Sequence, residues 1–197
     1  MLSVAIQAGG QSKRMGRDKA LVPLGGKPLI EHVLDRVRNL GDEVLITSNR
    51  PDTLAYLGLP IHGDPNPGDG ALAGLHTALE AASGKYVLVI ACDMPFVEPA
   101  LLQHMIQLSS QFEIVIPSMG GRYEPLLAIY ARSLLPRIEA TLAQGEMRMI
   151  SFYSQAQMRH VYEDEIKRFD PEMRSFFNIN TPQDLARAEG MLPAARS

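Results

Sequence analysis

A run of glycine and basic residues follows the first apolar segment of the chain, in the stretch AIQAGGQSKRMGRDKALVPLGGKP that begins at residue 5. Glycines allow backbone N–H groups to approach a ligand closely, and such groups bind anions. Arg14 and Lys19 add positive charges that can neutralise phosphate oxygens. The stretch lacks the Gly-Lys-Ser/Thr of a Walker A loop and the spacing GxGxxG, so it predicts a phosphate-binding loop of another kind. The alternative is an exposed glycine turn with solvated cations.

A carboxylate follows the most continuous apolar segment. Asp93, in ACDMP, comes directly after YVLVIA at residues 86–91, which has the pattern of a central parallel strand. Ligands bind beyond the carboxyl ends of such strands, and Mg²⁺ usually takes one or two carboxylates together with substrate phosphates. The alternative is that Asp93 caps the following helix. We interpret the neighbouring Cys92 as a small buried residue and not as a nucleophile.

The segment HGDPNPGDGALAG, residues 62–74, is rich in Gly, Pro, Asn and Asp and predicts a long loop. Backbone groups of such a loop could surround a nucleoside and read the edge of its base. The alternative is an ordinary surface loop, although loops of this length without a function are uncommon.

The elements that must position these residues alternate between strand and helix. This alternation predicts one α/β domain, residues 1–197, with a mostly parallel sheet between helical layers. Thr181 is the expected cap of the last helix, with Pro182 as its first residue and Asp184 as the capping-box partner. We expect strands at residues 2–6, 43–47, 86–91, 114–116 and 126–130, a short strand at 178–180, and helices at 28–37, 71–82, 99–108, 134–142 and from 181 onward.

Composition narrows the class of protein. The 197 residues suit one domain, and 46% hydrophobic with 21% charged residues is a globular balance. No apolar run approaches the roughly 20 residues of a membrane helix, the start does not resemble a signal peptide, and a single cysteine fits a reducing cytosol. The net charge of −3 and the local positive charge near the start favour a small anionic ligand over nucleic acid. We therefore expect a cytoplasmic protein without nucleic-acid or membrane partners.

The motifs, in their order along the chain, resemble those of the molybdenum cofactor guanylyltransferases, the MobA family. The opening is similar to the family pattern L-A-G-G-x-S-x-R-M-G-x-D-K followed by G-K-P-L. That motif also occurs in a wider nucleotidyltransferase superfamily, and the pair Asp18-Lys19 and the late NINTP narrow it to this family. The resemblance continues through Asn49, Asp64, ALAGL, ACDMP and EPLLAIY, and so covers nearly the whole chain.

The resemblance implies a Rossmann-like nucleotidyltransferase fold and transfer of GMP from GTP to molybdopterin with release of diphosphate. It implies Mg²⁺ as cofactor, with Asp93 binding both metal and nucleotide, and Lys19 and Arg14 acting on the phosphates. It also implies transient contact with other proteins of molybdenum cofactor biosynthesis. Nucleotide contacts are implied for Gln7, Ala8, Gly9, Lys19, Asn49, Asp64 and Asp93, and positions near the pterin acceptor for Asn178 and Asn180.

Three departures from the family pattern are visible. Gln7 replaces the usual leucine, GDGALAG replaces a Pro-Gly-Pro-Leu-Ala-Gly loop, and Glu124 precedes the proline where histidine or another residue is common. Two alternatives stay open: a cytidylyltransferase or another nucleotidyltransferase with a phosphorylated acceptor, and a non-catalytic nucleotide-binding regulator. The presence of Lys19 and Asp93 argues against the regulator.

Overall fold

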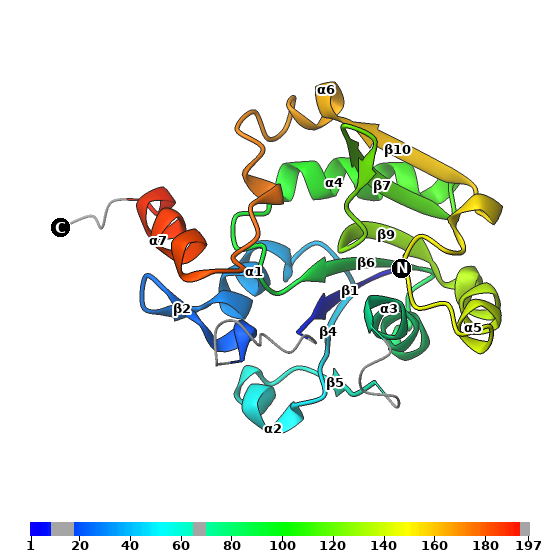
Figure 1. Ribbon diagram of the computed structural model, residues 1–197, viewed down its shortest axis with the longest axis horizontal. Coiled ribbons are helices and arrows are strands. Elements are labelled where there is room, and N and C mark those ends of the chain that lie inside the picture. The colour runs from blue at the N-terminus through cyan, green and yellow to red at the C-terminus, as the bar shows by residue number, and fades with distance from the viewer. Residues whose placement is uncertain (9–17, 65–69, 194–197) are drawn as a thin grey trace.

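The computed structural model describes residues 1–8, 18–64 and 70–193, and a single large sheet crosses it with helices on both faces (Figure 1). The sheet follows the order β10-β7-β9-β6-β1-β4-β5, and β8 pairs with β7. Its strands are β1 (Leu2–Gln7), β4 (Glu43–Thr47), β5 (Ile61–His62), β6 (Tyr86–Ala91), β7 (Ile114–Met119), β8 (Arg122–Tyr123), β9 (Leu127–Ala131) and β10 (Met158–Tyr162). The short strands β2 (Pro23–Leu24) and β3 (Lys27–Pro28) form a separate antiparallel hairpin.

The direction of the strands defines one functional edge. Strand β1 is parallel to β4 and β6, and β7 is parallel to β10. Strand β9 runs antiparallel to both β6 and β7, so β6 and β7 point the same way. The carboxyl ends of β1, β4, β6, β7 and β10 therefore meet at one edge, which we call the carboxyl edge. The predicted α/β class with a mostly parallel sheet is confirmed.

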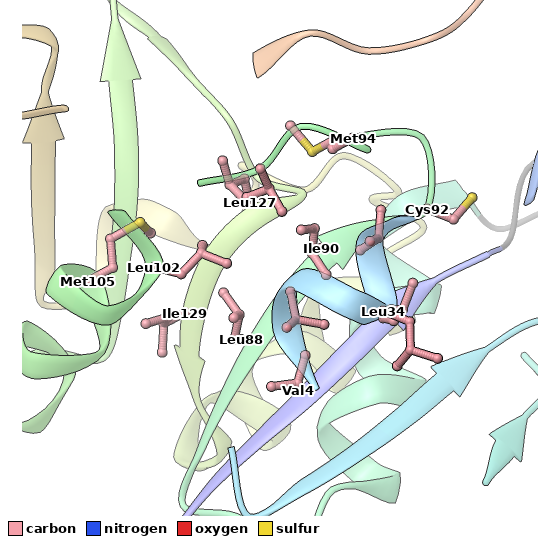
Figure 2. Packing of buried hydrophobic residues seen from close by; sticks show 14 of the residues in the cluster. Val4, Leu34, Leu88, Ile90, Cys92, Met94, Leu102, Met105, Leu127 and Ile129 are labelled. Atoms are coloured by element: carbon pink, nitrogen blue, oxygen red, sulfur yellow. The ribbon is translucent and has the colours of Figure 1, made fainter. Parts of the chain in front are cut away.

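Helices cover the sheet because alternate strand residues point to opposite faces. Val4 and Ile6 pack with α1 (Leu29–Val37) and α4 (Pro99–Leu108), whereas Ala5 packs with α3 (Gly70–Ala81) and α5 (Leu135–Ala143). Figure 2 shows the first of these cores, in which Leu88 and Ile90 of β6 and Leu127 and Ile129 of β9 lie between the strands and helices. The remaining α-helices of the described residues are α2 (Pro51–Leu54), α6 (Glu163–Ile166) and α7 (Pro182–Met191).

The last helix begins as the sequence predicts. Thr181 is its cap: the Thr181 hydroxyl accepts a hydrogen bond from the Asp184 backbone N–H at 3.1 Å, and Asp184 accepts one from the Thr181 N–H at 2.9 Å. Helix α7 packs on the β2–β3 hairpin through Ala188, which shares a small core with Leu24. In Figure 1 this helix lies beyond the carboxyl edge, on the side of the molecule toward which β1 and β6 point.

Two predicted elements are wrong. Residues 178–180 form no strand, because they lie beyond the sheet edge and bond instead to the turn after β6, through Ile179 N–H and the Asp93 carbonyl at 3.1 Å. The predicted loop at 62–74 is too long: His62 belongs to β5 and α3 already begins at Gly70, because Leu72, Leu75 and Leu79 recur at helical spacing on the buried side. Within the described ranges, no helix is long and apolar enough to cross a membrane.

Candidate active site

The ammonium group of Lys19 stands at the centre of the carboxyl edge. Its Nζ donates hydrogen bonds to a carboxylate oxygen of Asp93 and, at 2.6 Å, to the side-chain oxygen of Asn180. The Lys19 and Asp93 side chains are only 18% and 12% exposed, so water screens this pair poorly. Three segments that are far apart in the sequence thus meet at the Lys19 ammonium. One follows β1, one follows β6 and one precedes α7.

Lys19 is positioned by the residue before it. Asp18 caps the short 3₁₀ helix Lys19–Leu21, and its carboxylate accepts a hydrogen bond from the Ala20 N–H at 3.2 Å. The same carboxylate faces the Arg50 guanidinium, which follows β4, at 3.9 Å. The two residues of the pair therefore have different roles. Asp18 fixes the local backbone, and the Lys19 side chain extends to Asp93 and Asn180 at the carboxyl edge. The ion pair with Arg50 was not predicted, because only the strand order brings the ends of β1 and β4 together.

Asp93 points into the edge and does not cap the next helix. It lies in the turn after β6, and its carbonyl holds Ile179. The cap of α4 is Glu98, whose carboxylate accepts a hydrogen bond from the Ala100 N–H at 3.4 Å. The capping alternative for Asp93 is therefore wrong.

The two asparagines before α7 have different surroundings. The Asn180 N–H donates to Asp184 at 3.1 Å, so the helix cap also fixes the residue that contacts Lys19. The side-chain oxygen of Asn178 is buried and has no hydrogen-bond partner among the described residues. Because these residues form no strand, no strand geometry places the two side chains on one face. The structure brings the Asn180 side chain to the Lys19–Asp93 pair.

The other predicted nucleotide residues lie on the β1 and β4 side of this centre. The Ala8 N–H donates to the Thr47 carbonyl at 2.9 Å, and the side-chain oxygen of Asn49 accepts the Asp64 N–H at 2.7 Å. Asn49 and Asp64, which follow neighbouring strands, are thus brought together. Gly9 and Arg14 lie outside the described residues.

Burial raises the pKa of two groups near Asp93. The pKa of the Cys92 thiol rises to about 12 because the side chain is buried and Asp93 is negatively charged nearby. Burial also raises the pKa of the Glu124 carboxyl, and Asp93 raises it further. Cys92 is therefore a neutral thiol and not a nucleophile, as the sequence predicts. The proximity of Glu124 to Asp93 was not predicted, because it depends on β9 inserting antiparallel beside β6.

Comparisons with known proteins identify the family of the chain. Residues 4–160 match the family described as MobA-like NTP transferase domain. The chain belongs to this family. It is 35% identical to the probable molybdenum cofactor guanylyltransferase of Carboxydothermus hydrogenoformans, over 93% of this chain and 92% of that one, and 35% identical to the molybdenum cofactor guanylyltransferase of Desulfosudis oleivorans, over 97% and 96%.

A crystal structure of a similar protein has the same fold. Molybdopterin-guanine dinucleotide biosynthesis protein A from Archaeoglobus fulgidus superposes with a TM-score of 0.82 at 33% identity, covering 96% of this chain and 97% of that one. The family resemblance drawn from the sequence motifs is therefore confirmed. The superposition covers nearly the whole chain, whereas the family model ends at residue 160, before Asn180.

Gln7 stands where the family usually has leucine, and one atom of its side-chain amide has no hydrogen-bond partner among the described residues. Gln7 ends β1, is 7% exposed, and its buried Nε2 has no partner in the described part of the chain. This Nε2 packs so closely on α3 that a Cβ at Gly74 would overlap it. A buried donor without an acceptor destabilises the folded state by about 1 kcal/mol or more.

We predict that Gln7→Leu raises the free energy of unfolding by about 1 kcal/mol, because leucine removes the unpaired donor at similar volume. The measurement is urea denaturation of the apoprotein. The matched control is Gln183→Leu on the exposed side of α7, which should leave stability nearly unchanged. A loss of stability in Gln7→Leu would contradict the prediction and show that the amide makes a favourable bond.

Proposed function

We propose that the protein transfers the guanylyl group of GTP to molybdopterin and releases diphosphate. The observation that carries this proposal is the convergence of the Lys19 ammonium, the Asp93 carboxylate and the Asn180 amide oxygen at the carboxyl edge, in a chain whose relatives bear the name of that activity. The proposal also places the protein in the cytoplasm, where both substrates are soluble small molecules, and allows transient contact with other proteins of cofactor biosynthesis.

The chemistry required is displacement at the α-phosphorus of GTP. A phosphate oxygen of the acceptor forms the new P–O bond, and the bond to the departing diphosphate breaks. Nucleophile and leaving group are both anionic, so neutralising charge and aligning the groups are the main tasks. Lys19 supplies a positive charge for the phosphates, assisted by Arg14. Since no protein atom enters a covalent bond, the neutral thiol of Cys92 has no part in the reaction.

The residues at the centre fit a magnesium ion. Oxygens of Asp93 and Asn180 already converge on one cation, the Lys19 ammonium, and these are the hard ligands that Mg²⁺ prefers. No group of three acidic, histidine or cysteine ligands occurs among the described residues, so phosphates of the nucleotide and water would supply the further oxygen ligands. Bound there, magnesium would neutralise charge on the reacting phosphates. Asp93 and Asn180 would hold the ion, and Lys19 would then turn to the phosphates.

Nucleotide and acceptor are assigned to the two sides of this centre. Gln7 and Ala8, with Asn49 and Asp64, lie in or follow β1, β4 and β5, and we assign the nucleoside to that side. Gly9, which lies outside the described residues, is assigned to the nucleotide with them. Asn178 and Asn180 precede α7, and we assign the acceptor phosphate to their neighbourhood. A site with hydrogen-bond partners for the guanine edge leaves them unpaired when another base enters, so GTP should be preferred.

The proposed function is tested by incubating the protein with Mg²⁺, molybdopterin and each of the four nucleoside triphosphates in turn. We expect a dinucleotide product by mass, with equimolar diphosphate, from GTP in clear excess over the other three. Comparable turnover with CTP would instead support a cytidylyltransferase. Tight GTP binding without diphosphate release would support a non-catalytic regulator.

We predict that Asp93→Asn lowers kcat at least about 100-fold, because it removes a charge that serves the transition state more than the bound substrate. The GTP dissociation constant should change much less, and the thermal unfolding midpoint should stay close to that of the wild type. Asp52→Asn, an exposed carboxylate on α2, is the control. A folded Asp93→Asn variant with near-normal turnover at saturating Mg²⁺ would contradict the assignment.

A further inference from the structure

The side of the carboxyl edge away from β1 carries a second acidic group. Strand β7 reaches this edge beside β9 and turns back through Gly120 and Gly121, both with positive φ, into β8. Glu124 follows directly. Its backbone N–H donates to the Pro117 carbonyl at 3.1 Å, and its carbonyl accepts the Leu127 N–H at 3.2 Å. The backbone of Glu124 is therefore fixed from both sides.

A further hydrogen bond ties this turn to the reaction centre. The Leu126 carbonyl accepts the Ala91 N–H at 3.0 Å, and Ala91 is the last residue of β6, two positions before Asp93. Asp93 is close enough for its charge to raise the pKa of Glu124. The Glu124 carboxyl thus lies next to the centre, on the β9 and β7 side, opposite the residues assigned to the nucleoside.

The carboxyl of Glu124 has no ion-pair partner in the part of the chain that the structure describes. It is partly buried, and one backbone N–H, that of Leu126, offers it a hydrogen bond. A carboxylate here would repel triphosphate, so it does not suit the phosphates of either substrate. Its two oxygens suit a ligand edge with two adjacent N–H donors.

An aromatic group stands beside it. Tyr123 packs edge-to-face on Tyr153 at 5.8 Å and on His160 of β10 at 5.3 Å between ring centroids. The buried hydroxyls of Tyr153 and Tyr130 lie 2.7 Å apart, and Tyr130 donates to the Pro125 carbonyl at 2.9 Å. The residue after Glu124 is thus fixed by the same tyrosines, which are buried and make the backbone on this side rigid. Tyr123, next to Glu124, is the partly exposed aromatic side chain here.

We propose that Glu124 recognises the pterin ring of the acceptor, by accepting hydrogen bonds from the ring N–H and the exocyclic amino group of its 2-amino-4-oxopyrimidine edge. This inference rests on the proposed function. Guanine presents the same edge, so the shared chemistry is an amino-oxopyrimidine. The position of Glu124 on the β9 and β7 side, across Asp93 from Asn49 and Asp64, assigns it to the acceptor. Glu124 is therefore a specificity-determining residue and not a catalytic one.

The test compares Glu124→Gln with the wild type. A carboxamide replaces one of the two acceptor oxygens with an NH₂ donor, which then faces a donor of the ligand. The KM for molybdopterin should therefore rise about tenfold or more, while the KM for GTP and the preference for GTP over ITP stay unchanged. ITP lacks the 2-amino group of guanine and reports on the base site. Glu139→Gln, an exposed carboxylate on α5 with 60% of its side chain accessible, is the control for loss of one charge.

A second measurement uses simple pteridines as inhibitors of the transfer reaction. Pterin carries the 2-amino group, which can donate a hydrogen bond to the carboxylate. Lumazine carries a 2-oxo group there instead, and two acceptor oxygens would then oppose each other. Wild type should be inhibited at least about tenfold more strongly by pterin than by lumazine, and Glu124→Gln should lose that discrimination.

The outcomes separate the inference from the proposed function. Normal wild-type turnover with an unchanged KM for molybdopterin and unchanged discrimination in Glu124→Gln would overturn this inference alone. A raised KM for GTP together with a lost preference over ITP would also overturn it, by placing Glu124 at the guanine. Failure of the wild type to use molybdopterin would overturn the proposed function and this inference with it.

Discussion

The ammonium of Lys19 is the interaction on which the site depends. A charged group with so little exposure is stable only when it is paired and hydrogen-bonded, and its partners Asp93 and Asn180 come from segments 74 and 161 positions away in the sequence. The pairing therefore constrains the turn after β6 and the chain before α7 together. Two local interactions hold these segments in place: the capping box fixes the start of α7, and the Ile179 N–H bonds to the Asp93 carbonyl.

The order of strands in the sheet gives the Lys19–Asp93–Asn180 centre two different sides. Strand β1 is central and buried, with β6 on one flank and β4 on the other. The ends of β4 and β5 bring Asn49 and Asp64 together, whereas the reversed strand β9 brings Glu124 beside β6. A reaction that joins two anionic molecules needs this separation, because each must reach the charged centre from its own direction.

The sequence predicted those parts of the site that follow from strong local patterns. The continuous apolar run of β6 placed Asp93 at the carboxyl edge, and the Thr181, Pro182 and Asp184 pattern placed the start of α7. The contact of Lys19 with Asn180 could not be predicted, because Asn-Ile-Asn alternates like a strand although no neighbouring strand is available beyond the edge. Strand β10, with the sequence MRHVY, was missed because an edge strand that carries arginine and histidine lacks the apolar signal of a central one.

We propose that Lys19 exchanges its carboxylate partner for the phosphates of the nucleotide. The most direct test measures the dissociation constants of GTP and of guanosine for Lys19→Ala by titration calorimetry, with Lys27→Ala, a lysine paired with Asp35 near the β2–β3 hairpin, as the matched control. The account predicts that Lys19→Ala weakens GTP binding about tenfold to hundredfold, leaves guanosine binding nearly unchanged, and keeps the protein folded. Equal weakening of both ligands, or a collapse of the thermal unfolding midpoint, would contradict it, because Lys19 would then serve only to hold the three segments together.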